Sequence, residues 1–197
     1  MTEDLPSKED RLFCESEDWW NNACLNFTHD GLYLYGYGYK EAADILVNSV
    51  LESGERQDIL IHPIAFCYRH YLELSCKMIF KRSSILLDEP YLVPNSHSID
   101  KLWLSCLSKI EKIAPGECTD SINEITRLLH EFCQIDPFAT AFRYPNDKHG
   151  NTSLEGLQRI NIRNLGVVIN KIDTIIHGIL ERIHEYQSYK NEIESNI

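Results

Sequence analysis

The sequence predicts an all-α fold, an antiparallel bundle of about five helices. Apolar residues recur every three or four positions through successive segments, as they do on one face of a helix. Proline and glycine clusters separate these segments, and none of them shows a sustained strand-like alternation. A chain of 197 residues, of which 43% are hydrophobic, can bury a single core. We therefore expect residues 19–197 to form one helical domain after a flexible acidic segment at residues 1–18.

The first two predicted helices cover residues 30–53 and 63–82. Tyrosines alternate as in a strand only as far as Tyr39, whereas the helical spacing continues to the end of the segment. Gly54 then provides a helix end. The second helix is expected to begin at Pro63, because proline suits the first turn of a helix.

The remaining three helices are marked by their end signals. The third is expected to begin at Ser98 and to stop before Pro115. The fourth opens with a capping-box pattern that starts at Ser121, and Pro137 closes it. The fifth, over residues 161–189, has the most regular apolar period of the chain.

The composition excludes several classes of function. A net charge of −11 argues against a broad basic face for nucleic acid, although it leaves room for a small anion site. The scattered cysteines include no Cys-x-x-Cys pair and predict reduced thiols in a cytoplasmic protein. No apolar run is long enough to cross a membrane, so we expect no membrane partner. Metal-ligand spacings and phosphate-binding glycine loops are also missing, so no metal and no cofactor are expected.

The polar turn at residues 142–151 is the most informative stretch of the chain. It joins two helical segments and carries Arg143, Tyr144 and His149. Arginine supplies a forked permanent cation for phosphate oxygens, and histidine can carry a proton near neutral pH. Arg143 and His149 are therefore our candidate catalytic pair for a phosphodiester.

A second polar group lies in the predicted second helix. Arg69, His70, Glu73 and Lys77 fall within two turns, beside the apolar stripe. They could form a partly buried network that holds His70 in one tautomer beside a ligand, or a solvated face of ordinary ion pairs. His97 precedes the cap of the third helix and could hydrogen-bond across to the second helix.

Four features occur in a fixed order along residues 30–190. They are the helical bundle, the Arg-His pair followed by Glu73, the His-x-x-x-x-Leu-Trp sequence that opens at His97, and the Phe-Arg-Tyr-Pro turn around Arg143. Together they resemble HEPN-like (higher eukaryotes and prokaryotes nucleotide-binding) proteins of bacteria and archaea. Many of these proteins are metal-independent endoribonucleases of toxin–antitoxin or antiviral defence systems.

The resemblance implies one of two functions. The first is an endoribonuclease in which Arg143 and His149 match the spacing of the family, an Arg, a polar residue, then three to five other residues and a His, usually across a homodimer. Tyr144 stands where the family usually has Asn or Asp, which favours the second function, a catalytically silent sensor, regulator or protein-interaction module. Expected partners are RNA or a nucleotide, a second copy of the chain, and a cognate antitoxin or other defence-system protein. The residues expected to bind substrate are Arg69, His70, Glu73, Lys77, His97 and Tyr144.

Overall fold

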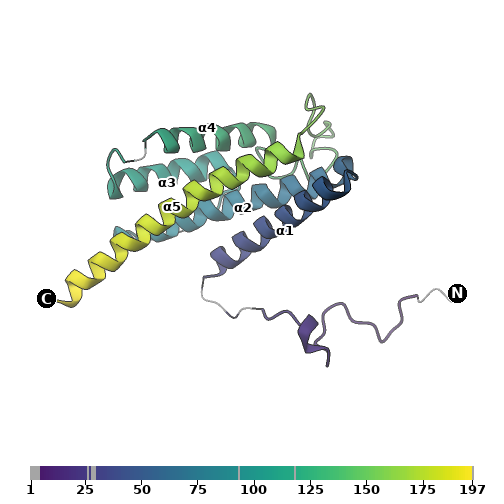
Figure 1. Cartoon of the computed structure of the whole chain (residues 1–197), viewed down its shortest axis with the longest axis horizontal. Helices are drawn as coiled ribbons and strands as arrows, with labels where there is room; N and C mark the ends of the chain where they lie inside the picture. The colour runs from purple at the N-terminus through teal and green to yellow at the C-terminus, as the bar shows by residue number, and fades with distance from the viewer. Residues whose placement is uncertain (1–4, 26, 28–29, 93, 118, 197) are drawn as a thin grey trace. The chain divides into compact units, whose positions relative to one another are not determined.

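The structure is a computed structural model that describes residues 5–25, 27, 30–92, 94–117 and 119–196 (Figure 1). It divides into two compact units, Met1–Gly31 and Leu32–Ile197, which we describe separately. No strand is present among the described residues; their only extended pairing is an isolated bridge between Asn146 and Thr152.

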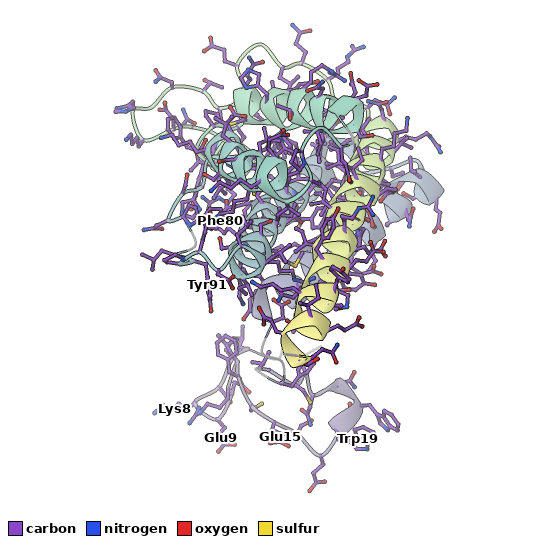
Figure 2. All side chains as sticks on the ribbon, turned by 90° about the vertical axis from the view of Figure 1, so that its left-hand side faces the viewer. Lys8, Glu9, Glu15, Trp19, Phe80 and Tyr91 are labelled. Carbon is purple, nitrogen blue, oxygen red and sulfur yellow. The ribbon has the colours of Figure 1, made fainter. Side chains whose placement is uncertain are left out.

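The described residues of the first unit form one short element, the 3₁₀ turn η1 (Trp19–Asn21). The indole rings of Trp19 and Trp20 stack with their centroids 3.6 Å apart. Most other side chains described in this unit are exposed, among them Lys8, Glu9 and Glu15 (Figure 2). The unit therefore builds no apolar core from its described residues.

The second unit is an all-α bundle of five helices, as the sequence predicts. They are α1 (Gly31–Ser53), α2 (Gln57–Leu86), α3 (Ile99–Ile113), α4 (Thr119–Ile135) and α5 (Ile162–Ser195). Helix α2 is central and packs against both α3 and α5, while α4 covers α3 and α5 (Figure 1).

The connection between α2 and α3 sets the direction of α3. Arg69, in the middle of α2, bonds to the carbonyl of His97 at the start of α3. Further along both helices, Cys106 Sγ donates to the carbonyl of Cys76. The connection between the two helices thus returns along α2, and α3 runs in the same direction as α2. This pair is therefore parallel, which corrects the antiparallel arrangement that the sequence predicts. The parallel arrangement brings the start of α3 to the polar residues of α2.

The core is filled by side chains from all five helices. Trp103 is the largest fully buried side chain, and its indole N–H donates to Thr126 Oγ1 at 2.7 Å. Full burial of such an apolar side chain contributes about 1.5–3 kcal/mol. The other large core residues include Ile64, Leu72, Ile79, Ile99, Leu102, Ile125, Leu129, Ile169 and Ile176.

A polar layer joins α1 to α2 and α5. Tyr68 donates its hydroxyl to Asp44 Oδ1 at 2.6 Å, and Tyr71 donates to Asp173. Lys40 Nζ lies 2.7 Å from Asp44 and 3.6 Å from Asp173. Burial, together with the neighbouring carboxylates, raises the pKa of both tyrosines. They therefore stay protonated donors at neutral pH, and the layer fixes α1 on the bundle.

Two helix starts differ from the prediction. Helix α2 begins at Gln57, so Pro63 lies inside it, on an exposed position where water can reach the carbonyl that its missing N–H leaves unpaired. Helix α4 begins at Thr119, before the capping-box pattern of Ser121. The starts of α3 and α5 are as predicted: Ser98 caps α3 through Lys101, and Asn161 caps α5 through Asn164.

Candidate functional site

Arg69 lies at the centre of a buried polar cluster and is only 1% exposed. Its Nη1 lies 3.2 Å from Glu73 Oε2, its Nε donates to the carbonyl of Asp136 at 3.1 Å, and its Nη2 donates to the carbonyl of His97 at 2.6 Å. One guanidinium therefore ties α2 to the residues before α3 and after α4. The sequence analysis expected Arg69 to contact substrate. Its burial instead assigns it to holding these segments together.

Asp136 extends this cluster into the turn that follows α4. Its Oδ1 accepts the main-chain N–H groups of Thr140 at 2.8 Å and Ala141 at 3.0 Å, while Oδ2 lies 3.4 Å from Arg69 Nε. The buried carboxylate thus fixes the backbone just before Arg143. Sequence reasoning missed Asp136. An Asp-Pro pair after a helix is a turn signal, but it does not reveal a buried partner.

Glu73 orients His97. Its Oε1 lies 2.8 Å from Lys77 Nζ and 3.0 Å from His97 Nδ1. Burial alone would raise the pKa of Glu73, but the hydrogen bonds from Lys77 and His97 outweigh it and lower that pKa. The side chain of His97 is 69% exposed, so its second ring nitrogen is open to solvent. The predicted bond from His97 across to the second helix is confirmed.

The solvated-face alternative for these α2 residues is wrong, because Arg69 and Glu73 are both buried. The network also holds a different histidine from the one expected. His70 lies edge-on to Tyr39 and stacks on Phe66, with ring centroids 4.4 and 6.0 Å away. Burial is the main cause that lowers the pKa of His70, so its imidazole is neutral at pH 7.

Arg143 is an exposed cation in a fixed position. Its Nε donates to the carbonyl of Ala139 at 2.7 Å. The guanidinium carbon lies 5.5 Å from the Phe66 ring centroid and 5.4 Å from that of Tyr144. Contacts with two rings hold the cation while leaving part of its fork exposed. Phe66 touches both Arg143 and His70, so the structure brings α2 and the turn together.

His149 lies at the tip of a tight loop and is exposed. Asp147 Oδ1 accepts the N–H groups of His149 at 2.8 Å and Asn151 at 2.9 Å. The side-chain hydrogen bond from Asn151 is the largest cause that lowers the pKa of Asp147. His149 and Arg143 make no hydrogen bond with each other in the structure, so the two predicted catalytic residues share a loop but not a direct contact.

A cavity of about 540 Å³ opens on this loop. Ligand sites commonly have volumes of about 300–1,000 Å³. The lining includes exposed aromatic rings, a cation and a titratable ring. It consists of Phe138, Thr140, Tyr144, Asn146, Asp147, Lys148 and His149. His149 and Tyr144 therefore line the same cavity. Phe138, which the sequence analysis did not single out, belongs to the same site.

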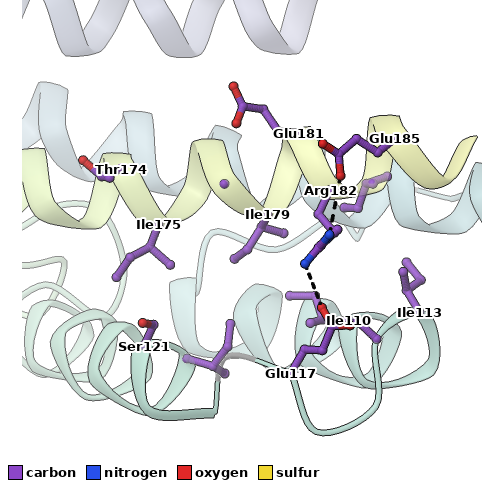
Figure 3. Close-up of a pocket in the computed structure, with 14 residues that line it drawn as sticks. Ile110, Ile113, Glu117, Ser121, Thr174, Ile175, Ile179, Glu181, Arg182 and Glu185 are labelled. Atoms are coloured by element: carbon purple, nitrogen blue, oxygen red, sulfur yellow. Dashed lines mark hydrogen bonds and ion pairs between the residues drawn. The ribbon is translucent and has the colours of Figure 1, made fainter. Parts of the chain in front are cut away.

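A second hollow lies elsewhere on the bundle, between α5 and the facing ends of α3 and α4 (Figure 3). Its volume is about 420 Å³, and its walls are mainly isoleucines such as Ile175 and Ile179. Arg182 reaches across it to Glu117, with 3.2 Å between Nη2 and Oε2. None of its described lining residues is a histidine or a cysteine, so these residues offer little for proton transfer or metal binding.

Two further searches bear on the chemistry of the described part of the chain. No group of three or more His, Cys, Asp or Glu side chains among these residues could hold a metal ion. No described helix has the length and apolar character needed to cross a membrane.

Comparison with protein-family models, with curated proteins and with solved structures found no match for this chain. The site is therefore interpreted from its own geometry.

Proposed function

We propose that this chain is a HEPN-like protein that binds RNA or a nucleotide at the surface formed by Arg143 and the loop that follows it. One observation carries the proposal: Arg143 is exposed, yet it is held by the Ala139 carbonyl and by the rings of Phe66 and Tyr144. A guanidinium fixed in this way can donate hydrogen bonds to two phosphate oxygens with little loss of side-chain conformational entropy.

The buried cluster around Arg69 and Asp136 also supports this proposal. Arg69 and Asp136 fix the backbone of the turn through hydrogen bonds to Thr140 and Ala141. The ligand-facing residues are therefore positioned before any ligand arrives, which reduces the free energy lost on binding.

Metal-independent RNA cleavage is the second candidate, favoured by the presence of His149 and Lys148 in the Tyr144 cavity. In this mechanism a neutral imidazole takes the proton of a ribose 2′-hydroxyl, and the 2′-oxygen attacks the adjacent phosphorus. The bond from phosphorus to the 5′-oxygen breaks, and the leaving oxygen takes a proton from a second, protonated imidazole. Arg143 stabilises the charge on the non-bridging oxygens. The products are a 2′,3′-cyclic phosphate and a 5′-hydroxyl, and a homodimer would supply the second histidine.

The test compares wild type with Arg143→Gln and His149→Ala in buffer that contains EDTA. Fluorescence anisotropy with labelled single-stranded RNA measures binding, and end-group analysis detects cyclic phosphates. We expect Arg143→Gln to weaken binding at least tenfold. If cleavage occurs, His149→Ala should abolish it while leaving binding intact.

The matched control is Arg127→Ala, which removes another exposed arginine, one paired with Glu124 and Glu131 on α4. Circular dichroism spectra check that each variant is folded. Equal RNA affinity of wild type and Arg143→Gln would refute the proposed site. Cleavage that survives in His149→Ala would refute its catalytic role alone.

A further inference from the structure

We infer that Phe138 and Tyr144 form a clamp for one unpaired nucleobase, so that the ligand of this loop is a single-stranded nucleotide unit. The inference rests on the proposed function, because it places the phosphate of that unit at Arg143. It adds two residues with a defined role and a class of substrate.

The two rings are both exposed, and they line the same cavity. The side chain of Phe138 is 78% exposed and that of Tyr144 is 55% exposed, and both line the cavity of about 540 Å³. Contiguous exposed apolar surface can mark a ligand-binding groove. The cavity therefore presents aromatic surface that is open to a ligand, with Arg143 lying against the Tyr144 ring.

The backbone under both rings is held in place. The N–H groups of Arg143 and Tyr144 both donate to the carbonyl of Thr140 at 3.0 Å. Ala139 adopts the left-handed conformation with a φ of 61°, and Asp136 secures the next two N–H groups. Backbone strain of this kind persists only where the surroundings enforce it, and it fixes the positions from which the two rings project.

The surrounding charges match the rest of a nucleotide. Arg143 lies against the Tyr144 ring, and Lys148 lines the cavity with it. A base stacked on the rings would therefore place its phosphate near permanent cations. Base–aromatic stacking contributes about 1–3 kcal/mol per base and is tolerant of sequence. A duplex hides its bases in the stack, so only an unpaired base can enter the cavity.

The experiment measures the affinity of labelled single-stranded RNA, of the same RNA in a duplex, and of AMP. Phe138→Ala and Tyr144→Ala should each raise the Kd for the single strand about five- to hundredfold, whereas Tyr144→Phe keeps the ring and should stay near wild type. The control is Tyr189→Ala, which removes a 65% exposed tyrosine near the end of α5. RNA that contains 5-iodouridine should crosslink to Phe138 or Tyr144, identified by mass spectrometry of the peptides.

The outcomes separate this inference from the proposed function. If Arg143→Gln loses binding while both alanine variants of the rings retain it, the clamp is refuted and the phosphate site stands. If wild type binds neither RNA nor AMP, the proposed function and the clamp fall together. Duplex binding as tight as single-strand binding would also refute the clamp. AMP binding that depends on the same two rings would identify a free nucleotide as a sufficient ligand.

Discussion

Arg69 illustrates how much of the candidate site depends on residues that no ligand touches. A buried guanidinium is costly to desolvate, and here the cost is offset by Glu73, by Asp136 and by the carbonyl of His97. Each partner belongs to a different part of the chain. Removing the guanidinium would leave the buried Asp136 carboxylate without its cation, would leave Glu73 with Lys77 and His97 alone, and would release both loops.

We therefore expect Arg69→Ala to lower the free energy of unfolding by about 3–5 kcal/mol, the usual effect of breaking a buried ion pair. Urea denaturation followed by circular dichroism measures this change. Arg127→Ala is the control, since its ion pairs on α4 are exposed and should contribute less than about 1 kcal/mol. A loss of similar size in both variants would contradict the central role of Arg69.

His70 gives the protein a pH-dependent stability. Burial lowers the pKa of His70, so the folded state binds its proton less readily than the unfolded state does. The contribution of the neutral ring is fully present above the unfolded pKa of about 6.5. It is lost as the pH falls through the lower, folded pKa.

His70→Phe keeps a ring between Tyr39 and Phe66 but removes this titration. We expect the stability of wild type to fall relative to the variant between pH 7.5 and pH 5, as measured by urea denaturation at each pH. All the other histidines remain in both proteins, so the difference between the two proteins reports on the ring at position 70 and its interactions. A constant difference across this range would show that burial does not disfavour the charged ring.

At the scale of the helices, local signals in the sequence predicted those ends that depend on local contacts. Ser98 and Asn161 cap helices through residues three positions later, and such bonds can be inferred from spacing. The start of α2 could not be inferred in this way. Arg56, which precedes it, has the positive φ of 66° that would normally suggest glycine, and Pro63 mimics a first-turn residue.

The residues of the candidate site likewise divide into those that local sequence spacing predicts and those that it does not. The pair of Glu73 and Lys77 follows from the spacing of i and i+4 in one helix. Phe66 and Asp136 were not predicted, because their partners come from segments distant in the sequence. Periodicity describes one helix at a time and carries no information about which loop meets its polar face.

Two glycines of α5 test how closely α1 and α2 pack against it. A Cβ added at Gly166 would lie 3.3 Å from Val47 Cγ1 and 3.4 Å from the hydroxyl of Tyr68, whereas one added at Gly178 would meet nothing within 4 Å. Gly178→Ala should raise the free energy of unfolding by about 0.5–1 kcal/mol through helix propensity. Gly166→Ala should not show this increase in the free energy of unfolding, because Val47 or Tyr68 must move to make room for the added methyl group.

Urea denaturation of both variants provides the comparison. The two substitutions are chemically identical and lie in the same helix, so any difference between them reports on the packing at Gly166. Equal stabilisation would mean that α1 and α2 yield easily to a methyl group at this interface.

At the scale of the whole molecule, the net charge limits the ways in which the chain could bind RNA. The net charge of −11 repels a polyanion, and much of the negative excess lies near the two ends of the chain. A protein of this charge cannot rely on a broad electrostatic surface, so its affinity has to come from a few cations and from stacking. Arg143 and Lys148 are the permanent cations that the loop offers.

This charge distribution predicts a weak dependence of RNA affinity on salt. For single strands the slope of log K against log salt concentration is about −0.7 for each phosphate neutralised, so two or three contacts give a slope of about −1.4 to −2.1. Fluorescence anisotropy between about 50 and 300 mM salt measures the slope, over a range of salt concentration that shortens the Debye length about 2.4-fold. Arg143→Gln should make the slope shallower by about 0.7, whereas Tyr144→Ala should weaken binding with the slope unchanged, because stacking releases no counterions. A slope steeper than about −4 would require more phosphate contacts than Arg143 and Lys148 can make, and would therefore place the RNA elsewhere or on an additional partner.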